Sequence, residues 1–149
     1  DVTAVIADLE KDVNHAVKNA DKVIFAAGSK GENVIGVDQE GAKRLIDAGK
    51  DAGVKKFVML SSMGADNPSV SDTLEDYLRA KQNADEYLKT SGLEYNIVRP
   101  GSLVNEEGTG KIQLKEKLEN YEVFQEQMLP KRLLKYCRTM SCKIRSSKY

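Results

Sequence analysis

Lys56-Phe-Val-Met-Leu60, followed at once by Ser61-Ser62, is the stretch that decides the fold of this 149-residue chain. It is a short and nearly continuous apolar run, which is typical of a strand buried on both faces of a sheet. Three similar runs predict further strands, so we expect one buried sheet. They are Thr3-Ala-Val-Ile-Ala7, Lys22-Val-Ile-Phe-Ala26 and Glu94-Tyr-Asn-Ile-Val98.

Amphipathic stretches separate the predicted strands. Val34 to Ala52 carries its apolar residues on one broad face and stops before Gly53, which suits a helix C-terminus. A second helix is predicted from about Leu74 to Lys89, before Ser91-Gly92, and a short one over Val13 to Asn19. Strands that alternate with helices of this length pair in parallel through right-handed crossovers. The sequence therefore predicts an α/β protein with a doubly wound parallel sheet.

A ligand site is expected at the carboxyl ends of the strands, where doubly wound sheets bind small molecules. The residues that follow the predicted strands are Asp8-Leu9, Ala27-Gly28-Ser29, Ser61-Ser62 and Pro100-Gly101. Small residues dominate two of these turns, and they allow a ligand to approach the backbone closely. We therefore expect functional residues in these turns.

Tyr77-Leu-Arg-Ala-Lys81, on the helix after Ser62, provides a candidate acid-base pair. Residues four apart lie one helical turn apart, so the phenol and the ammonium are expected on one face. A free tyrosine titrates near about 10, and a nearby cation favours its phenolate form. A serine hydroxyl opposite would hydrogen-bond and orient a substrate oxygen. The spacing by itself is weak evidence, and its plain interpretation is an exposed helix that bears an aromatic residue.

The order of the motifs strengthens the functional interpretation. An apolar strand, Ser61-Ser62, the Tyr77-to-Lys81 stretch, a further strand and Arg99-Pro100-Gly101 follow one another. In this order the sequence resembles the short-chain dehydrogenase/reductase superfamily, and specifically its atypical NAD(P)-binding members, the NAD(P)-dependent epimerase/dehydratase-like or NAD(P)H-binding proteins. The resemblance covers about residues 1 to 121. It implies a Rossmann-like fold and NAD or NADP as the cofactor.

The resemblance also implies roles for individual residues. Ser62 falls on the family's active-site serine, with Ser61 as the less suitable choice, and Tyr77 and Lys81 fall on its tyrosine and lysine. In the family this lysine also bonds the nicotinamide ribose. The alternative for Ser62 and Tyr77 is strand-end capping and helix packing. The cofactor positions fall on Asp8 and Leu9 beside the adenine, on Ala26, Ala27 and Gly28 against the ribose, and on Pro100, Gly101 and Ser102 beside the nicotinamide.

The sequence departs from the family at its start, because the first two strands and the Gly-x-x-Gly-x-x-Gly turn are missing. That turn opens the helix whose amides bind the pyrophosphate, and the second strand carries the residue that selects NAD or NADP. In the family order 3-2-1-4-5-6 the missing strands separate Thr3–Ala7 from Lys22–Ala26. The first segment is expected to close against the second or to hang free. We expect a truncated member that binds dinucleotide weakly or not at all.

The end of the chain departs from the family as well. Residues 1–121 hold 16 Lys and Arg against 21 Asp and Glu, whereas residues 122–149 hold 7 against 2. Restoring one nucleotide just before Glu122 yields GSISRADVAKTLVEVL, a family-like continuation, which predicts a frameshift. We therefore expect a partial NAD(P)-binding domain over 1–121 and a basic non-family tail over 122–149. The charge of the tail then implies no nucleic-acid partner, and the spacing of Cys137 and Cys142 does not suit zinc.

The expected function follows from this resemblance. Full-length relatives would carry out NAD(P)-dependent hydride or proton transfer at a carbonyl or alcohol of a small molecule, through Ser62, Tyr77 and Lys81. A module that senses NAD(P) without turnover and an inactive gene remnant stay open as alternatives. No apolar run is long enough to span a bilayer and no signal peptide is recognisable, so a cytoplasmic protein without a membrane partner is expected. Arg99 is expected in a structural ion pair, and His15 on a solvated helix.

Overall fold

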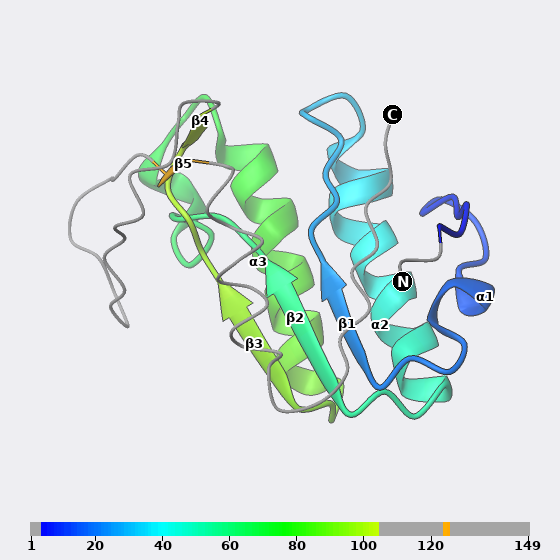
Figure 1. Ribbon diagram of the computed structural model, residues 1–149. Helices are drawn as coiled ribbons and strands as arrows, with labels where there is room; N and C mark the ends of the chain where they lie inside the picture. The colour runs from blue at the N-terminus through cyan, green and yellow to red at the C-terminus, as the bar shows by residue number, and fades with distance from the viewer. Residues whose placement is uncertain (1–3, 105–123, 126–149) are drawn as a thin grey trace.

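A three-stranded parallel sheet forms the centre of the molecule (Figure 1). The computed structural model describes residues 4–104 and 124–125. Its main strands are β1 (Lys22–Phe25), β2 (Lys56–Leu60) and β3 (Tyr95–Val98), in the spatial order β1-β2-β3. Both pairings are parallel. The predicted α/β class and the parallel, open sheet of the Rossmann type are confirmed.

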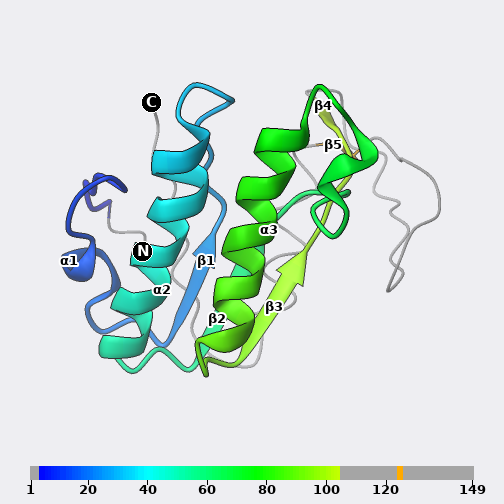
Figure 2. The same cartoon turned by 180° about the vertical axis from the view of Figure 1, so that it is seen from behind.

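Helices connect the strands across one face of the sheet. A π-helix, η1 (Val34–Gly41), continues into α2 (Ala42–Asp51) between β1 and β2, and α3 (Glu75–Thr90) connects β2 with β3. Figures 1 and 2 view the molecule from opposite sides and show α2 and α3 on the same face. The smaller elements are α1 (Asn14–Val17), the 3-10 helix η2 (Pro68–Val70), and the parallel pair β4 (Leu103–Val104) and β5 (Phe124–Gln125).

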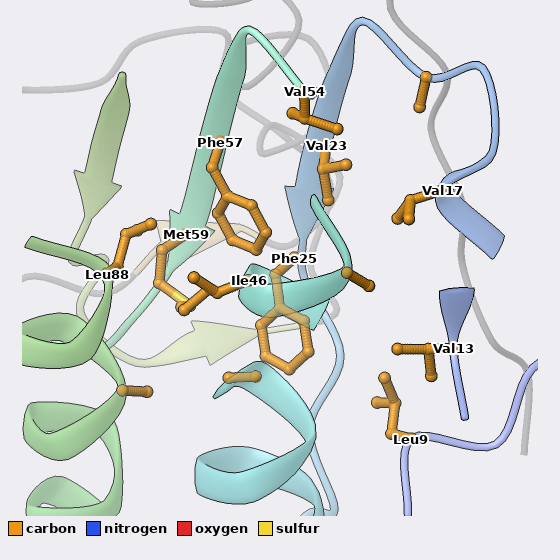
Figure 3. Close-up of a cluster of buried hydrophobic side chains, with 14 of the residues drawn as sticks. Leu9, Val13, Val17, Val23, Phe25, Ile46, Val54, Phe57, Met59 and Leu88 are labelled. Carbon is orange, nitrogen blue, oxygen red and sulfur yellow. The ribbon is translucent and has the colours of Figure 1, made fainter. Parts of the chain in front are cut away.

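The hydrophobic core lies between the sheet and these two helices (Figure 3). Phe25 of β1 and the β2 residues Phe57 and Met59 pack there against Ile46 of α2 and Leu88 of α3. Each of the five side chains is 2% exposed or less. Because successive strand residues point to opposite faces, positions two apart on β2 both reach the helices. Burial of side chains of this size stabilises the fold by about 1.5–3 kcal/mol each.

Glycines end both long helices. Gly53 follows α2 with a φ of 69°, and Gly92 follows α3 with a φ of 83°. Both angles lie in the left-handed region, where a residue with a side chain is strained. The predicted helix ends at these two glycines are therefore confirmed, and each glycine turns the chain toward the next strand.

The helix predicted over Val34 to Ala52 differs from the structure in its first half, which is a π-helix. The side chain of Asn33 caps this segment by accepting the backbone N–H of Gly36 at 3.0 Å. A Cβ on Gly36 would lie 2.5 Å from Asn33 Nδ2, so this close approach requires glycine. Val37 and Asp38 of this π-helical segment are both buried. Local π-helical turns are frequent at functional sites.

The strand predicted over Thr3 to Ala7 is wrong. Residues 4–7 form no strand, and Ile6 is 97% exposed. Across the described residues no strand pairs with residues 4–7, and an apolar run forms a strand only beside a partner strand. The segment does not close against β1 either. His15 is exposed on α1, as predicted, and its Nε2 lies 2.9 Å from the carbonyl oxygen of Ile6.

The predicted basic tail, residues 122–149, lies outside the described residues apart from Phe124–Gln125 of β5. The same holds for both cysteines, Cys137 and Cys142. Across residues 4–104 and 124–125, none of the helices combines the length and the apolar character needed to cross a bilayer.

Two isoleucines provide a matched test of this core. Ile46→Ala should lower the free energy of unfolding by about 2–5 kcal/mol, because the Ile46 side chain is fully buried and its removal leaves a cavity. Ile35→Ala should cost less than about 1 kcal/mol, since that side chain is 56% exposed. Urea unfolding of both variants measures the difference, and equal losses would contradict the described packing.

Candidate functional site

The turns that follow the strands lie at one edge of the sheet, the upper edge in Figure 1. Two backbone hydrogen bonds extend the β2–β3 pairing into these turns. The N–H of Ser61 donates to the carbonyl oxygen of Val98 at 2.8 Å, and the N–H of Met63 donates to that of Pro100 at 2.9 Å. The Ser61-Ser62 turn and the Pro100 turn are therefore held side by side.

Tyr77 and Lys81 lie on one face of the first turns of α3, as predicted. Lys81 Nζ is 5.5 Å from the centre of the Tyr77 ring. Lys81 is 4% exposed, whereas Tyr77 is half-buried. An ammonium at this distance interacts favourably with the face of an aromatic ring. The arrangement brings a positive charge close to the phenol.

Asp38 is the partner of Lys81 that sequence reasoning missed. Its Oδ1 lies 3.0 Å from Lys81 Nζ, and both side chains are buried. This contact is an ion pair between two buried groups. A sequence signal exists, since Asp38 is an acidic residue that directly follows Val37 on the apolar side of the predicted helix. A carboxylate in such a place requires a buried partner.

Ser61 and Ser62 have different surroundings. The hydroxyl of Ser61 is buried and donates to Asp85 Oδ2 at 2.9 Å. The Ser62 hydroxyl is half-buried and has a long contact of 3.3 Å to the carbonyl oxygen of Met63. The hydroxyl of Ser61 is thus committed to a structural contact, whereas Ser62 is the serine with the less strongly bound hydroxyl.

Asp85 also holds Arg99, and the predicted structural ion pair of Arg99 is confirmed. Arg99 Nη2 lies 2.9 Å from Asp85 Oδ2 and Nε lies 3.1 Å from the same oxygen. Burial raises the pKa of the Asp85 carboxyl, and the hydrogen bonds from Ser61 and Arg99 oppose this shift. The ends of β2 and β3 are therefore tied to α3 through one carboxylate.

The remaining predicted cofactor positions fall into three groups. Asp8 accepts the N–H of Glu10 at 2.9 Å, and this bond together with Lys11 lowers the pKa of its carboxyl. Leu9 is buried in the core. The other positions lie in turns at the carboxyl edge of the sheet: Ala26 and Gly28 are exposed, Ala27 and Gly101 are half-buried, Pro100 is buried and Ser102 is exposed.

Hydrogen-bonding groups and approachable backbone lie together at this edge of the sheet. A buried ammonium, the Tyr77 phenol and turns that contain Gly28 and Gly101 combine hydrogen-bonding groups with backbone that a ligand can approach closely. Within residues 4–104 and 124–125, no cluster of His, Cys, Asp and Glu is suited to a metal ion. An open parallel sheet with this edge defines a nucleotide-binding α/β protein of the Rossmann type.

The chain belongs to the NAD(P)H-binding family, whose model matches residues 1–128. It is 41% identical over 124 residues to the uncharacterized sugar epimerase YhfK of Bacillus subtilis, an alignment that covers 78% of this chain and 58% of the relative. The chain therefore spans about three fifths of the length of this relative. The resemblance to an NAD(P)-binding oxidoreductase/epimerase-like family, and NAD or NADP as its cofactor, are confirmed.

Two solved structures are similar to this chain. A putative NAD-dependent epimerase/dehydratase from Bacillus halodurans has a TM-score of 0.73 and 39% identity, over 80% of this chain and 59% of the other. The oxidoreductase ylbE from Lactococcus lactis has a TM-score of 0.81 and 30% identity, over 96% of this chain and 69% of the other. Both similarities support the Rossmann-like fold.

The raised pKa of Asp85 predicts a pH-dependent stability difference. The native state then holds this proton more tightly than the unfolded state, whose carboxyl titrates near 3.8. Native stability should therefore fall as pH rises from that value through the raised pKa. Asp85→Asn removes this ionisation, so its stability relative to the unchanged protein should increase over the same interval. Urea unfolding from about pH 4 to 7 measures this difference in unfolding free energy between the variant and the unchanged protein. Asp51→Asn, at an exposed site, is the control, and a constant difference for Asp85→Asn would contradict the assignment.

Proposed function

We propose that the protein acts as an NAD(P)-dependent oxidoreductase or epimerase at a carbonyl or alcohol of a small molecule. The observation that carries the proposal is the placement of the Tyr77 phenol and the Lys81 ammonium on one face of α3, in a chain of the NAD(P)H-binding family. Nucleic acid and membrane are not proposed as partners. The chain spans about three fifths of the length of the B. subtilis relative, so the proposed activity is that of the whole protein.

Tyr77 is the proposed proton donor and acceptor. Its half-buried position leaves the phenol reachable for a substrate oxygen, while Lys81 places a positive charge 5.5 Å from the ring centre. This charge stabilises the phenolate that forms when the proton leaves. Ser62 is proposed to donate a hydrogen bond to the substrate oxygen and to orient it for this transfer.

Lys81 is proposed to have a second role, in holding the cofactor ribose together with the turn that contains Ala26, Ala27 and Gly28. The Pro100-Gly101-Ser102 turn would lie beside the nicotinamide, and Asp8-Leu9 beside the adenine. When bound, the cofactor supplies or accepts a hydride. The chain's own residues orient the reacting groups and move the proton, which is the division of labour expected of a cofactor-dependent enzyme.

The names of relatives are consistent with this reaction class. The B. subtilis protein is named a sugar epimerase and the L. lactis protein an oxidoreductase. The first name describes inversion of a stereocentre of a sugar, and the second describes a redox reaction. The proposed substrate is a small molecule that carries a carbonyl or alcohol group.

Tyr77→Phe is the direct test of the proposed catalytic role. Tested in the whole protein, it should lower turnover by roughly a hundredfold or more and leave the affinity for NADH and NADPH nearly unchanged, because the phenol that transfers the proton is lost while the ribose contacts remain. Turnover is measured as consumption of the reduced nicotinamide with a panel of aldehydes, ketones and quinones, and affinity by titration calorimetry. Tyr95→Phe, on an exposed residue at the opposite end of the sheet, is the matched control.

Lys81→Ala should reduce both turnover and dinucleotide affinity, because the same ammonium serves the phenol and the ribose. Unchanged turnover in Tyr77→Phe would refute the role of the tyrosine. Binding of NADH or NADPH without turnover of any substrate in the panel would instead favour a module that senses the dinucleotide.

A further inference from the structure

Asp38 lies between two parts of the candidate site that are distant in sequence. Its carboxylate is 1% exposed, and its two oxygens have different partners. Oδ2 accepts the backbone N–H of Ser29 at 3.0 Å and the Ser29 hydroxyl at 2.7 Å. Oδ1 lies 3.0 Å from Lys81 Nζ. One side chain thus connects the turn after β1 with the helix that carries Tyr77.

The ion pair keeps a positive charge inside the protein. The rings of Phe25 and Tyr77 lie 6.0 and 5.5 Å from Lys81 Nζ and attract the ammonium only modestly. Burying an ammonium without a counter-charge favours its neutral form or unfolding. The carboxylate of Asp38 supplies this counter-charge to Lys81 beside the tyrosine.

The turn after β1 also fits closely against this carboxylate. A Cβ added to Gly28 would lie 3.1 Å from Asp38 Oδ1, which is closer than ordinary van der Waals contact. The glycine therefore permits the backbone to approach Asp38, and a side chain there would displace the carboxylate. The position of the turn and the position of the Lys81 ammonium both depend on Asp38.

We propose that Asp38 is a positioning residue that holds the Lys81 ammonium and the Ala26–Ser29 turn in one fixed arrangement, so that a cofactor ribose meets both together. Its catalytic meaning rests on the proposed function. The arrangement itself can be tested without turnover, and Asp38 transfers no proton in this role.

Asp38→Asn separates the two contacts of this side chain. An amide oxygen still accepts from Ser29, but the amide offers no negative charge to Lys81. In the cofactor-free 149-residue chain, NMR of isotope-labelled lysine side chains should give a slowly exchanging ammonium signal for Lys81, assigned by its loss in Lys81→Arg. We expect Asp38→Asn to abolish or shift this signal and to leave the Ser29 amide signal near its original position. Asp51→Asn, at an exposed site, should change neither signal.

An unchanged Lys81 ammonium signal in Asp38→Asn would overturn the proposal. If that variant does not fold, the unchanged chain still decides the matter. A buried and ion-paired ammonium exchanges its protons slowly, so the absence of a slowly exchanging Lys81 signal there would overturn the proposal as well.

Binding and turnover give an independent measurement. Asp38→Asn should weaken NADH or NADPH binding and lower turnover by roughly tenfold each, and should add little when combined with Lys81→Ala, because both changes act through one ammonium. Losses that multiply in the double variant would overturn action through Lys81. If the unchanged protein turns over nothing while the NMR signals respond as expected, the proposed function fails and the positioning role stands.

Discussion

Parallel pairing of β1, β2 and β3 is the constraint on which the rest of the structure depends. Parallel neighbours cannot be joined by a tight turn, so each connection must return along the sheet, and here it does so through α2 and α3. The same pairing brings the turns after all three strands to one edge. The core in Figure 3 and the candidate site are therefore two results of one arrangement, the first beneath the helices and the second above the strand ends.

Two carboxylates penetrate this interior, and each is matched by a cation from a different element. Asp38 of η1 faces Lys81 of α3, and Asp85 of α3 faces Arg99 after β3. Buried ion pairs contribute little net stability, because desolvation offsets most of the attraction, but removing one partner is costly. Such pairs are better understood as fixing geometry. In this molecule both pairs involve α3, and they fix its position relative to η1 and to the end of β3.

The sequence predicts the elements that are specified by nearby residues. The apolar run of β2, the two serines and the amphipathic α3 are each recognisable within a short window, and so is the glycine that ends a helix. The segment Thr3–Ala7 is different, because an apolar run becomes a strand only when another strand lies beside it. The π-helical turns of η1 follow a side-chain cap from Asn33, and an average helical period reveals neither feature.

The site was predictable to a similar degree. The shared face of Tyr77 and Lys81 follows from helical spacing, and the sequence predicts an ion pair for Arg99 without identifying its partner. The Asp38–Lys81 contact joins residues 43 positions apart, and no local pattern specifies such a pair. The distinction between the two serines required knowledge of burial, since their hydroxyls differ only in what the fold places around them.

The π-helical geometry of η1 has a consequence for insertions and deletions. Each residue of a helix rotates the chain by a fixed angle about the helix axis, so the rotation of Asp38 relative to α2 depends on how many residues separate them. Losing one residue from Gln39 to Gly41 would rotate the preceding turn relative to α2 and move the carboxylate away from α3, while the packing of Ile46 could remain intact. For the position of the Asp38 carboxylate, the number of residues in this short segment therefore matters as much as their identity.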